Sequence, residues 1–276
     1  MDPLTLLLFG KFPREVGTPA RKIVNSLFSF SRFVDTYNGI RDVYVCVYDL
    51  KLNIDKVFIE IDAPSLEKAL ESARTLHLKL RALDLPHVIT FSGHRGFHFY
   101  VLFQPWVPPN VETAKAVIKH LQQVLSEGVK YVDRRVFGDV RRLVRVPGTL
   151  HLVTRRYCTY VSYDLLFSSA EKIVVWSERH HVVDLKIKKL PDIRELVDVD
   201  YVPEPEVEAI ERLDLPSHSI PHDVYEFLRR IIRPCVAELL KHDRRLVEIG
   251  NPNLSLIHIS EPTRPRLISY AVFCLK

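Results

Sequence analysis

Residues 57–91 read VFIEIDAPSLEKALESARTLHLKLRALDLPHVITF, and this run predicts a β-α-β unit. The β-branched and aromatic residues at 57–61 are typical of a strand, and residues 86–91 have the same character. Between them, leucine and alanine recur at three- and four-residue steps over 66–83, after Ser65 as the helix N-cap. Strands that a crossover helix connects run parallel. We therefore expect an α/β chain in which these two strands run parallel.

Further helices and strands are predicted on both sides of this unit. Apolar residues at helical spacing predict helices, and β-branched or aromatic runs predict strands. The predicted helices are 18–38 and 112–126, the second with Gly128 as C-cap, and the predicted strands are 43–48, 97–103, 142–146 and 157–162. The fold class that follows is α/β (α+β), a sheet with flanking helices.

The chain after this region changes in composition. We expect residues 1–197 to form the principal domain, because residues 198–221 are acidic and carry several prolines, as linkers do. Residues 222–253 predict a short helical segment that needs partners for stability. Residues 254–276 resemble a translated sequencing adapter, so we expect a non-native tail and an interrupted reading frame. The alternative for the tail is a genuine amphipathic segment.

Composition indicates a globular protein of the cytoplasm. The chain has 276 residues, 47% of them hydrophobic, and a net charge of +5. Its basic residues cluster at 130–156, which permits a polyanionic partner. The four cysteines form no CxxC pair, so we expect neither a disulfide framework nor zinc. The apolar run at 4–9 is too short to span a membrane and lacks the flanks of a signal peptide, so we expect no membrane association.

Three elements carry residues suited to chemistry. Glu60 and Asp62 are two positions apart on a predicted strand, so both point to one face and offer the hard oxygen ligands that divalent metals prefer. The alternative is a solvated strand end. The run SGHRGFH at 92–98 predicts a tight glycine loop whose N–H groups, serine and arginine bind phosphate. The alternative here is an ordinary hairpin turn.

The third element begins at Asp133 and ends at His151. Asp133 completes a possible carboxylate cluster, while Arg145 and His151 are suited to a triphosphate. The alternative is a strand with charged outer positions that enters the turn at 147–148.

Together the three elements resemble the catalytic small subunit of the archaeo-eukaryotic primase superfamily, over about residues 10–165. That family has a pair of acids on a strand, an S-G-x-R-G-x-H loop, a third acid and an R-L-x-R-x-P-G-S-L-H run. The matching residues are Ser92, Gly93, Arg95, Gly96 and His98, then Asp133, Asp139, Arg142, Leu143, Arg145, Pro147, Gly148, Leu150 and His151, with Thr149 in place of serine.

The resemblance implies a primase-type fold with an RRM-like mixed sheet, and an enzyme that synthesises RNA or DNA primers on a DNA template. It implies that two Mg²⁺ or Mn²⁺ ions bind Glu60, Asp62 and Asp133. The triphosphate of an NTP or dNTP is then expected at Ser92, Arg95, His98, Arg145 and His151. The implied partners are a single-stranded DNA template and a primase large or accessory subunit, or a downstream helicase domain.

Two features depart from the family pattern. Position 60 is Glu where cellular small subunits usually carry Asp, and the zinc-binding insertion of many cellular members has no counterpart among the cysteines. In these two features the sequence resembles a trimmed member of the family. Two other functions stay open: a catalytically inert module that binds nucleic acid or a partner subunit, and an unrelated metal-dependent phosphohydrolase.

Overall fold

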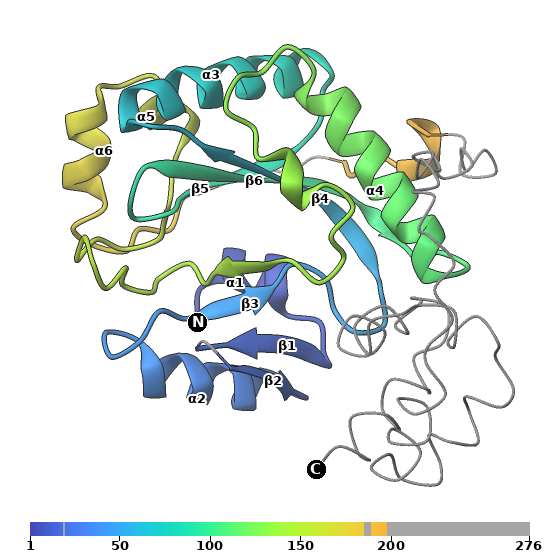
Figure 1. Ribbon diagram of the computed structural model, residues 1–276, viewed down its shortest axis with the longest axis horizontal. Helices are drawn as coiled ribbons and strands as arrows, with labels where there is room; N and C mark the ends of the chain where they lie inside the picture. Colours follow the sequence, from blue (N-terminus) through green and yellow to red (C-terminus); the bar gives the residue numbers. More distant parts are fainter. Residues whose placement is uncertain (19, 185–188, 198–276) are drawn as a thin grey trace, which may run out of the picture. The chain divides into compact units, whose positions relative to one another are not determined.

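The computed structural model describes residues 1–18, 20–184 and 189–197 (Figure 1). The predicted linker, helical segment and tail at 198–276 lie outside the described residues. The described strands form two antiparallel four-stranded sheets with flanking helices.

The first sheet contains the predicted β-α-β unit. Its strand order is β4-β6-β5-β8, with the bounds β4 Ile54–Asp62, β5 His87–Phe91, β6 Gly96–Trp106 and β8 Thr159–Tyr160. Strands β4 and β5 each pair antiparallel with β6, so they run in the same direction, as predicted, but are not neighbours. The reason is the short turn after β5, which returns the chain as β6 into the space between them.

Two long helices pack on this sheet. Helix α3 (Leu66–Ala82) is capped by Ser65, whose hydroxyl accepts a hydrogen bond from the Lys68 amide, as predicted. Helix α4 (Val111–Ser126) is capped by Asn110. Figure 1 shows both helices along one side of the sheet, where they bury their apolar faces. The C-cap of α4 is Glu127, and the predicted cap Gly128 follows it in a left-handed conformation, at φ +77°.

The second sheet has the order β2-β1-β3-β7, with the bounds β1 Arg14–Gly17, β2 Arg21–Val24, β3 Tyr44–Cys46 and β7 Leu143–Arg145. The prediction of one helix over 18–38 is wrong for its first part. Strand β2 pairs with β1, and helix α2 (Leu27–Tyr37) begins only after Ser26, whose hydroxyl caps the Ser29 amide. Pairing in a hairpin with the preceding strand β1 outweighs the helical spacing of the apolar residues in this segment.

Several short elements were not predicted. They are strand β1, the helices α1 Pro3–Phe9, α5 Tyr163–Leu166 and α6 Ala170–Trp176 and the 3₁₀ turns η1 Arg134–Val136 and η2 Ile193–Glu195. Helix α1 contains the apolar run 4–9 and buries Leu8 and Phe9 in the core. In the described ranges, no helix combines the length and apolar character needed to cross a membrane.

Candidate active site

Backbone pairing along the free edge of β4 places the three predicted acids on one face of this strand pair. The Asp133 amide donates to the Glu60 carbonyl at 2.9 Å, and the Asp62 amide donates to the Tyr131 carbonyl at 3.0 Å. Ile61 and Val132 form the antiparallel bridge between these two bonds. Residues opposite each other in such a pair share a face, with Cβ atoms about 5 Å apart. Glu60 and Asp133 therefore lie side by side, and Asp62 follows on the same face.

A buried glutamine holds the segment of Asp133 in this position. Gln122 of α4 donates through Nε2 to the Phe58 carbonyl of β4 at 2.7 Å. Its Oε1 accepts from the Gly138 amide, also at 2.7 Å. One buried side chain thus connects β4, α4 and the loop that follows Asp133, and so supports the backbone pairing that sets the spacing of the acids.

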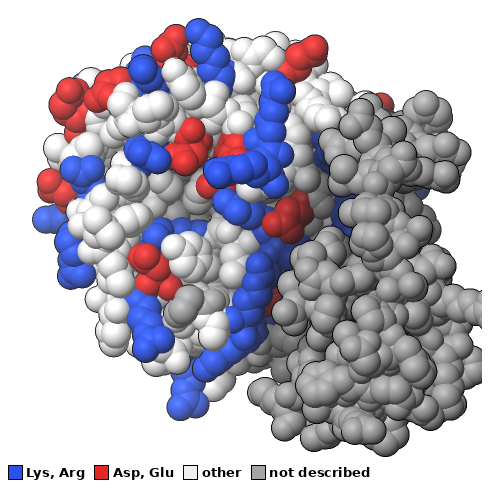
Figure 2. Space-filling view, in the orientation of Figure 1, with Lys and Arg blue, Asp and Glu red and all other residues white. Residues whose placement is uncertain are grey.

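Each of the three carboxylates is held by an arginine. The pairs are Glu60 with Arg142 at 2.6 Å, Asp62 with Arg95 at 3.1 Å and Asp133 with Arg135 at 2.8 Å. Hydrogen bonds from Arg135 outweigh the effect of burial and lower the pKa of Asp133. On the face seen in Figure 2, acidic and basic side chains lie next to one another. In the part of the chain that the structure describes, no group of three His, Cys, Asp or Glu residues is close enough to hold a metal ion.

The predicted phosphate loop is a closed turn in this structure. The Ser92 amide donates to the Gly96 carbonyl at 2.9 Å, and the Ser92 hydroxyl accepts from the amides of Gly96 and His94 at 3.2 and 3.4 Å. These two amides, which we expected to face a phosphate, are thus directed at Ser92. Position 96 has to be glycine, because a Cβ atom there would lie only 2.6 Å from the carbonyl oxygen of Ile61 in β4.

His98 lies on β6 directly opposite Glu60 and is only 5% exposed. Its Nδ1 is buried and has no hydrogen-bond partner among the described residues. Burial lowers the pKa of His98, with an opposing effect from the charge of Glu60 and a further lowering from Arg142 and Arg145. His98 is therefore a buried imidazole directly beside Glu60.

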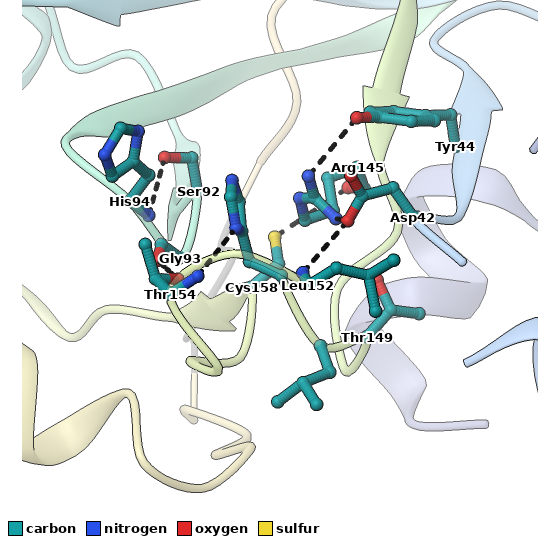
Figure 3. A network of polar contacts seen from close by, with 12 residues as sticks. Asp42, Tyr44, Ser92, Gly93, His94, Arg145, Thr149, Leu152, Thr154 and Cys158 are labelled. Carbon is teal, nitrogen blue, oxygen red and sulfur yellow. Dashed lines mark hydrogen bonds and ion pairs between the residues drawn. The ribbon is translucent and has the colours of Figure 1, made fainter. Parts of the chain in front are cut away.

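Arg145 and the loop of His151 meet at Asp42, a residue that the sequence did not single out (Figure 3). Arg145 donates through Nη1 to Asp42 Oδ1 at 2.6 Å and through Nη2 to the Tyr44 hydroxyl at 3.2 Å. Its guanidinium also lies over the Tyr44 ring, 5.1 Å from the centroid. The Leu152 amide donates to the same Asp42 oxygen at 3.1 Å. One carboxylate thus fixes the guanidinium and the backbone beside His151.

The loop at 92–98 connects this cluster with the acids. On one side Arg95 pairs with Asp62. On the other, the Thr154 hydroxyl donates to the Gly93 carbonyl at 2.6 Å, and the rings of His94 and His151 lie 5.4 Å apart. The structure therefore brings all the predicted site residues into one region around this loop.

Sequence reasoning missed Asp42 and Tyr44, and it gave no role to Arg135. Asp42 directly precedes a predicted strand, and nothing in its local pattern distinguishes it from a loop residue. Arg135 belongs to a basic doublet, which sequence alone assigns only to a general cationic patch. Only their contacts in the folded chain show their importance. Asp42 pairs with Arg145, and Arg135 pairs with Asp133.

No protein-family model matches this chain, and no curated protein matches it in sequence. One similar solved structure is the polymerase domain of Mycobacterium tuberculosis ligase D in complex with DNA, at 12% identity, a TM-score of 0.38, and coverage of 59% of this chain and 69% of that chain. Another is the AEP domain of the cyanophage S-2L primase-polymerase, at 15% identity, a TM-score of 0.42, and coverage of 63% and 94%. The chain is thus structurally similar to polymerase and primase-polymerase domains of this kind, at low sequence identity.

Proposed function

We propose that this chain is a DNA-templated nucleotidyltransferase that synthesises RNA or DNA primers. The observation that carries the proposal is the pairing of residues 131–133 with the edge of β4. That pairing lines up Glu60, Asp62 and Asp133 on one face. The S-G-x-R-G-x-H loop lies directly beside them, because Arg95 contacts Asp62.

The three acids have the donor chemistry for two Mg²⁺ or Mn²⁺ ions. Carboxylate oxygens on one face are ligands that these hard cations prefer. When bound, two such ions lower the pKa of an attacking 3′-hydroxyl and stabilise the leaving pyrophosphate. Glu60, Asp62 and Asp133 would hold them, and the extra methylene of Glu60 lets its carboxylate reach out from a position inside the strand pair.

The other site residues would bind and orient the nucleotide. Arg95 offers a forked guanidinium to the triphosphate, and Ser92 offers a hydroxyl. Arg145 and His151 present a cation and a ring donor from a backbone that Asp42 already fixes, so little ordering entropy is lost on binding. His98 excludes water beside Glu60, because it is buried.

Template binding would use the basic residues at 130–156, and its affinity would fall as salt rises. Base pairing supplies the order of the product, so no side chain needs to read the template. A primase large or accessory subunit, or a helicase domain, remains our proposal for a further partner.

One observation favours a second candidate, an inert module that binds nucleic acid. All three acids are in ion pairs with arginine, as they would be if they only stabilised the fold. Two of these pairs are largely exposed on at least one side, and exposed pairs add only about 0–1 kcal/mol to stability. A structural role therefore gives little reason for three acids to be aligned.

A primer-extension assay separates the candidates. The full chain is incubated with single-stranded DNA, labelled NTPs or dNTPs, and Mg²⁺ or Mn²⁺, with and without an annealed primer. We expect longer products and release of pyrophosphate, and neither with Asp62→Asn. Template binding without synthesis in any condition would support the inert module, and release of orthophosphate would support a phosphohydrolase.

A further inference from the structure

The arginines that hold the acids come from three separate segments of the chain. Arg95 lies in the loop before β6, Arg135 lies in η1 and Arg142 directly precedes β7. Three carboxylates thus meet three guanidiniums, and their formal charges cancel. A site that is neutral in this way has no net attraction for a polyanion, so its charge has to change before it binds a triphosphate well.

Two of these ion pairs, those of Arg135 and Arg95, are exposed enough to be exchanged. The Arg135 side chain is 84% exposed although that of Asp133 is only 9% exposed, so the guanidinium lies at the water boundary over a nearly buried carboxylate. Arg95 and Asp62 are 45% and 42% exposed. Exposed guanidiniums lose little when they move to another anion, because water and salt already screen them.

The guanidinium of Arg142 has a hydrogen-bond donor that is not satisfied. Its Nη2 binds Glu60, but its Nε is buried and has no hydrogen-bond partner among the described residues. A buried donor without a partner is costly to stability. An anion with several acceptor oxygens, such as a phosphate, would satisfy both nitrogens of this fork.

We infer that Arg135 and Arg142 are two further phosphate-binding residues that exchange partners during substrate binding. Each guanidinium rests on a carboxylate until divalent cations take the carboxylate oxygens, and then binds the phosphates of the nucleotide together with Arg95. The inference rests on the proposed function. It makes metal binding and nucleotide binding strongly cooperative, because each metal ion both occupies the acids and releases a cation.

The exchange is tested by equilibrium binding, without catalysis. Mn²⁺ binding to the full chain is followed by the loss of the free-ion electron paramagnetic resonance signal. Binding of a fluorescent dideoxynucleoside triphosphate is followed by anisotropy, with and without Mn²⁺. In the wild type we expect each ligand to increase the affinity for the other.

The variants Arg142→Met and Arg135→Met keep an apolar stem and remove the competing cation. We expect each to bind Mn²⁺ alone up to about fivefold more tightly. We expect each also to bind the nucleotide with Mn²⁺ about tenfold more weakly, because a charge-assisted hydrogen bond is lost. The opposite directions of these two changes separate exchange from a structural role.

Arg32→Met is the control, since Arg32 is exposed on α2, outside the basic stretch 130–156, and the described residues show no ion pair for it. It should change neither affinity. Unchanged or weaker Mn²⁺ binding in both variants, in a protein whose Mn²⁺ binding is lost on Asp62→Asn, would overturn the exchange. If instead the wild type binds no Mn²⁺ that depends on Asp62, the proposed function itself fails.

Discussion

The acids at β4 and the cluster at Asp42 both pair carboxylates with arginines, but they do so in different surroundings. At β4, three carboxylates meet three guanidiniums, and the side chains of Arg95 and Arg135 are 45% and 84% exposed. At Asp42, one carboxylate receives a guanidinium that is only 7% exposed, a tyrosine stacks on that guanidinium, and a backbone amide adds a second bond. The first arrangement is suited to exchange and the second to fixing geometry.

The largest expected effect is on nucleotide addition, and it comes from a substitution among the acids at β4. Asp62→Asn should lower nucleotide addition by at least about a hundredfold, because it removes a charged group from the reacting centre. Its side chain is 42% exposed, so the thermal unfolding midpoint should change little. Primer extension and a melting curve on the same preparation measure both. Near-wild-type synthesis by a folded Asp62→Asn variant would remove the metal assignment.

Substitution in the cluster at Asp42 should chiefly lower the free energy of unfolding. Asp42→Ala leaves the guanidinium of Arg145 buried without its carboxylate, and breaking such a pair costs roughly 3 kcal/mol. Urea denaturation of the variant measures the loss. Asp42→Asn is the matched control, because the amide oxygen still accepts one hydrogen bond and should recover part of the stability. Equal stability of wild type and Asp42→Ala would mean that the cluster does not fix Arg145.

Substitution of Arg145 should chiefly change the binding of the nucleotide. Arg145→Ala should chiefly raise the apparent KM for the nucleotide, by about tenfold for the loss of a charge-assisted contact, and leave kcat nearly unchanged. Tyr44→Phe keeps the ring under the guanidinium and removes one hydrogen bond, so its KM should change much less. A KM that stays the same in Arg145→Ala would assign Arg145 a purely structural role.

Local pattern was sufficient to predict the elements that carry most of the candidate site. Strand β4, helix α3 with its Ser65 cap and the hairpin that leads into β6 all follow from apolar period and turn residues. Strand β2 was predicted as helix because Ile23 and Leu27 are four residues apart, and only its pairing with β1 decides otherwise.

Local sequence pattern could not predict contacts between residues that are far apart in the chain. Arg142 reaches Glu60 across 82 positions, and Arg145 reaches Asp42 across 103. No period or turn residue encodes which of many arginines meets which carboxylate. The resemblance to primases singled out the acids and the loop as candidate site residues, but the more exposed and the more buried ion pairs became distinguishable only through the structure.

The smallest expected effect comes from a direct comparison of the Asp62–Arg95 and Asp42–Arg145 ion pairs. A double-mutant cycle between Asp62→Asn and Arg95→Met should give a coupling free energy of about 0–1 kcal/mol, which falls further in 1 M salt, because both side chains are exposed. A cycle between Asp42→Asn and Arg145→Met should give a larger coupling that salt changes little, because Arg145 is shielded from solvent. Urea denaturation at low and high salt measures both cycles. If the Asp62 pair proved as strong and as insensitive to salt as the Asp42 pair, it would be a fixed structural contact, and Arg95 would not be free to move to a phosphate.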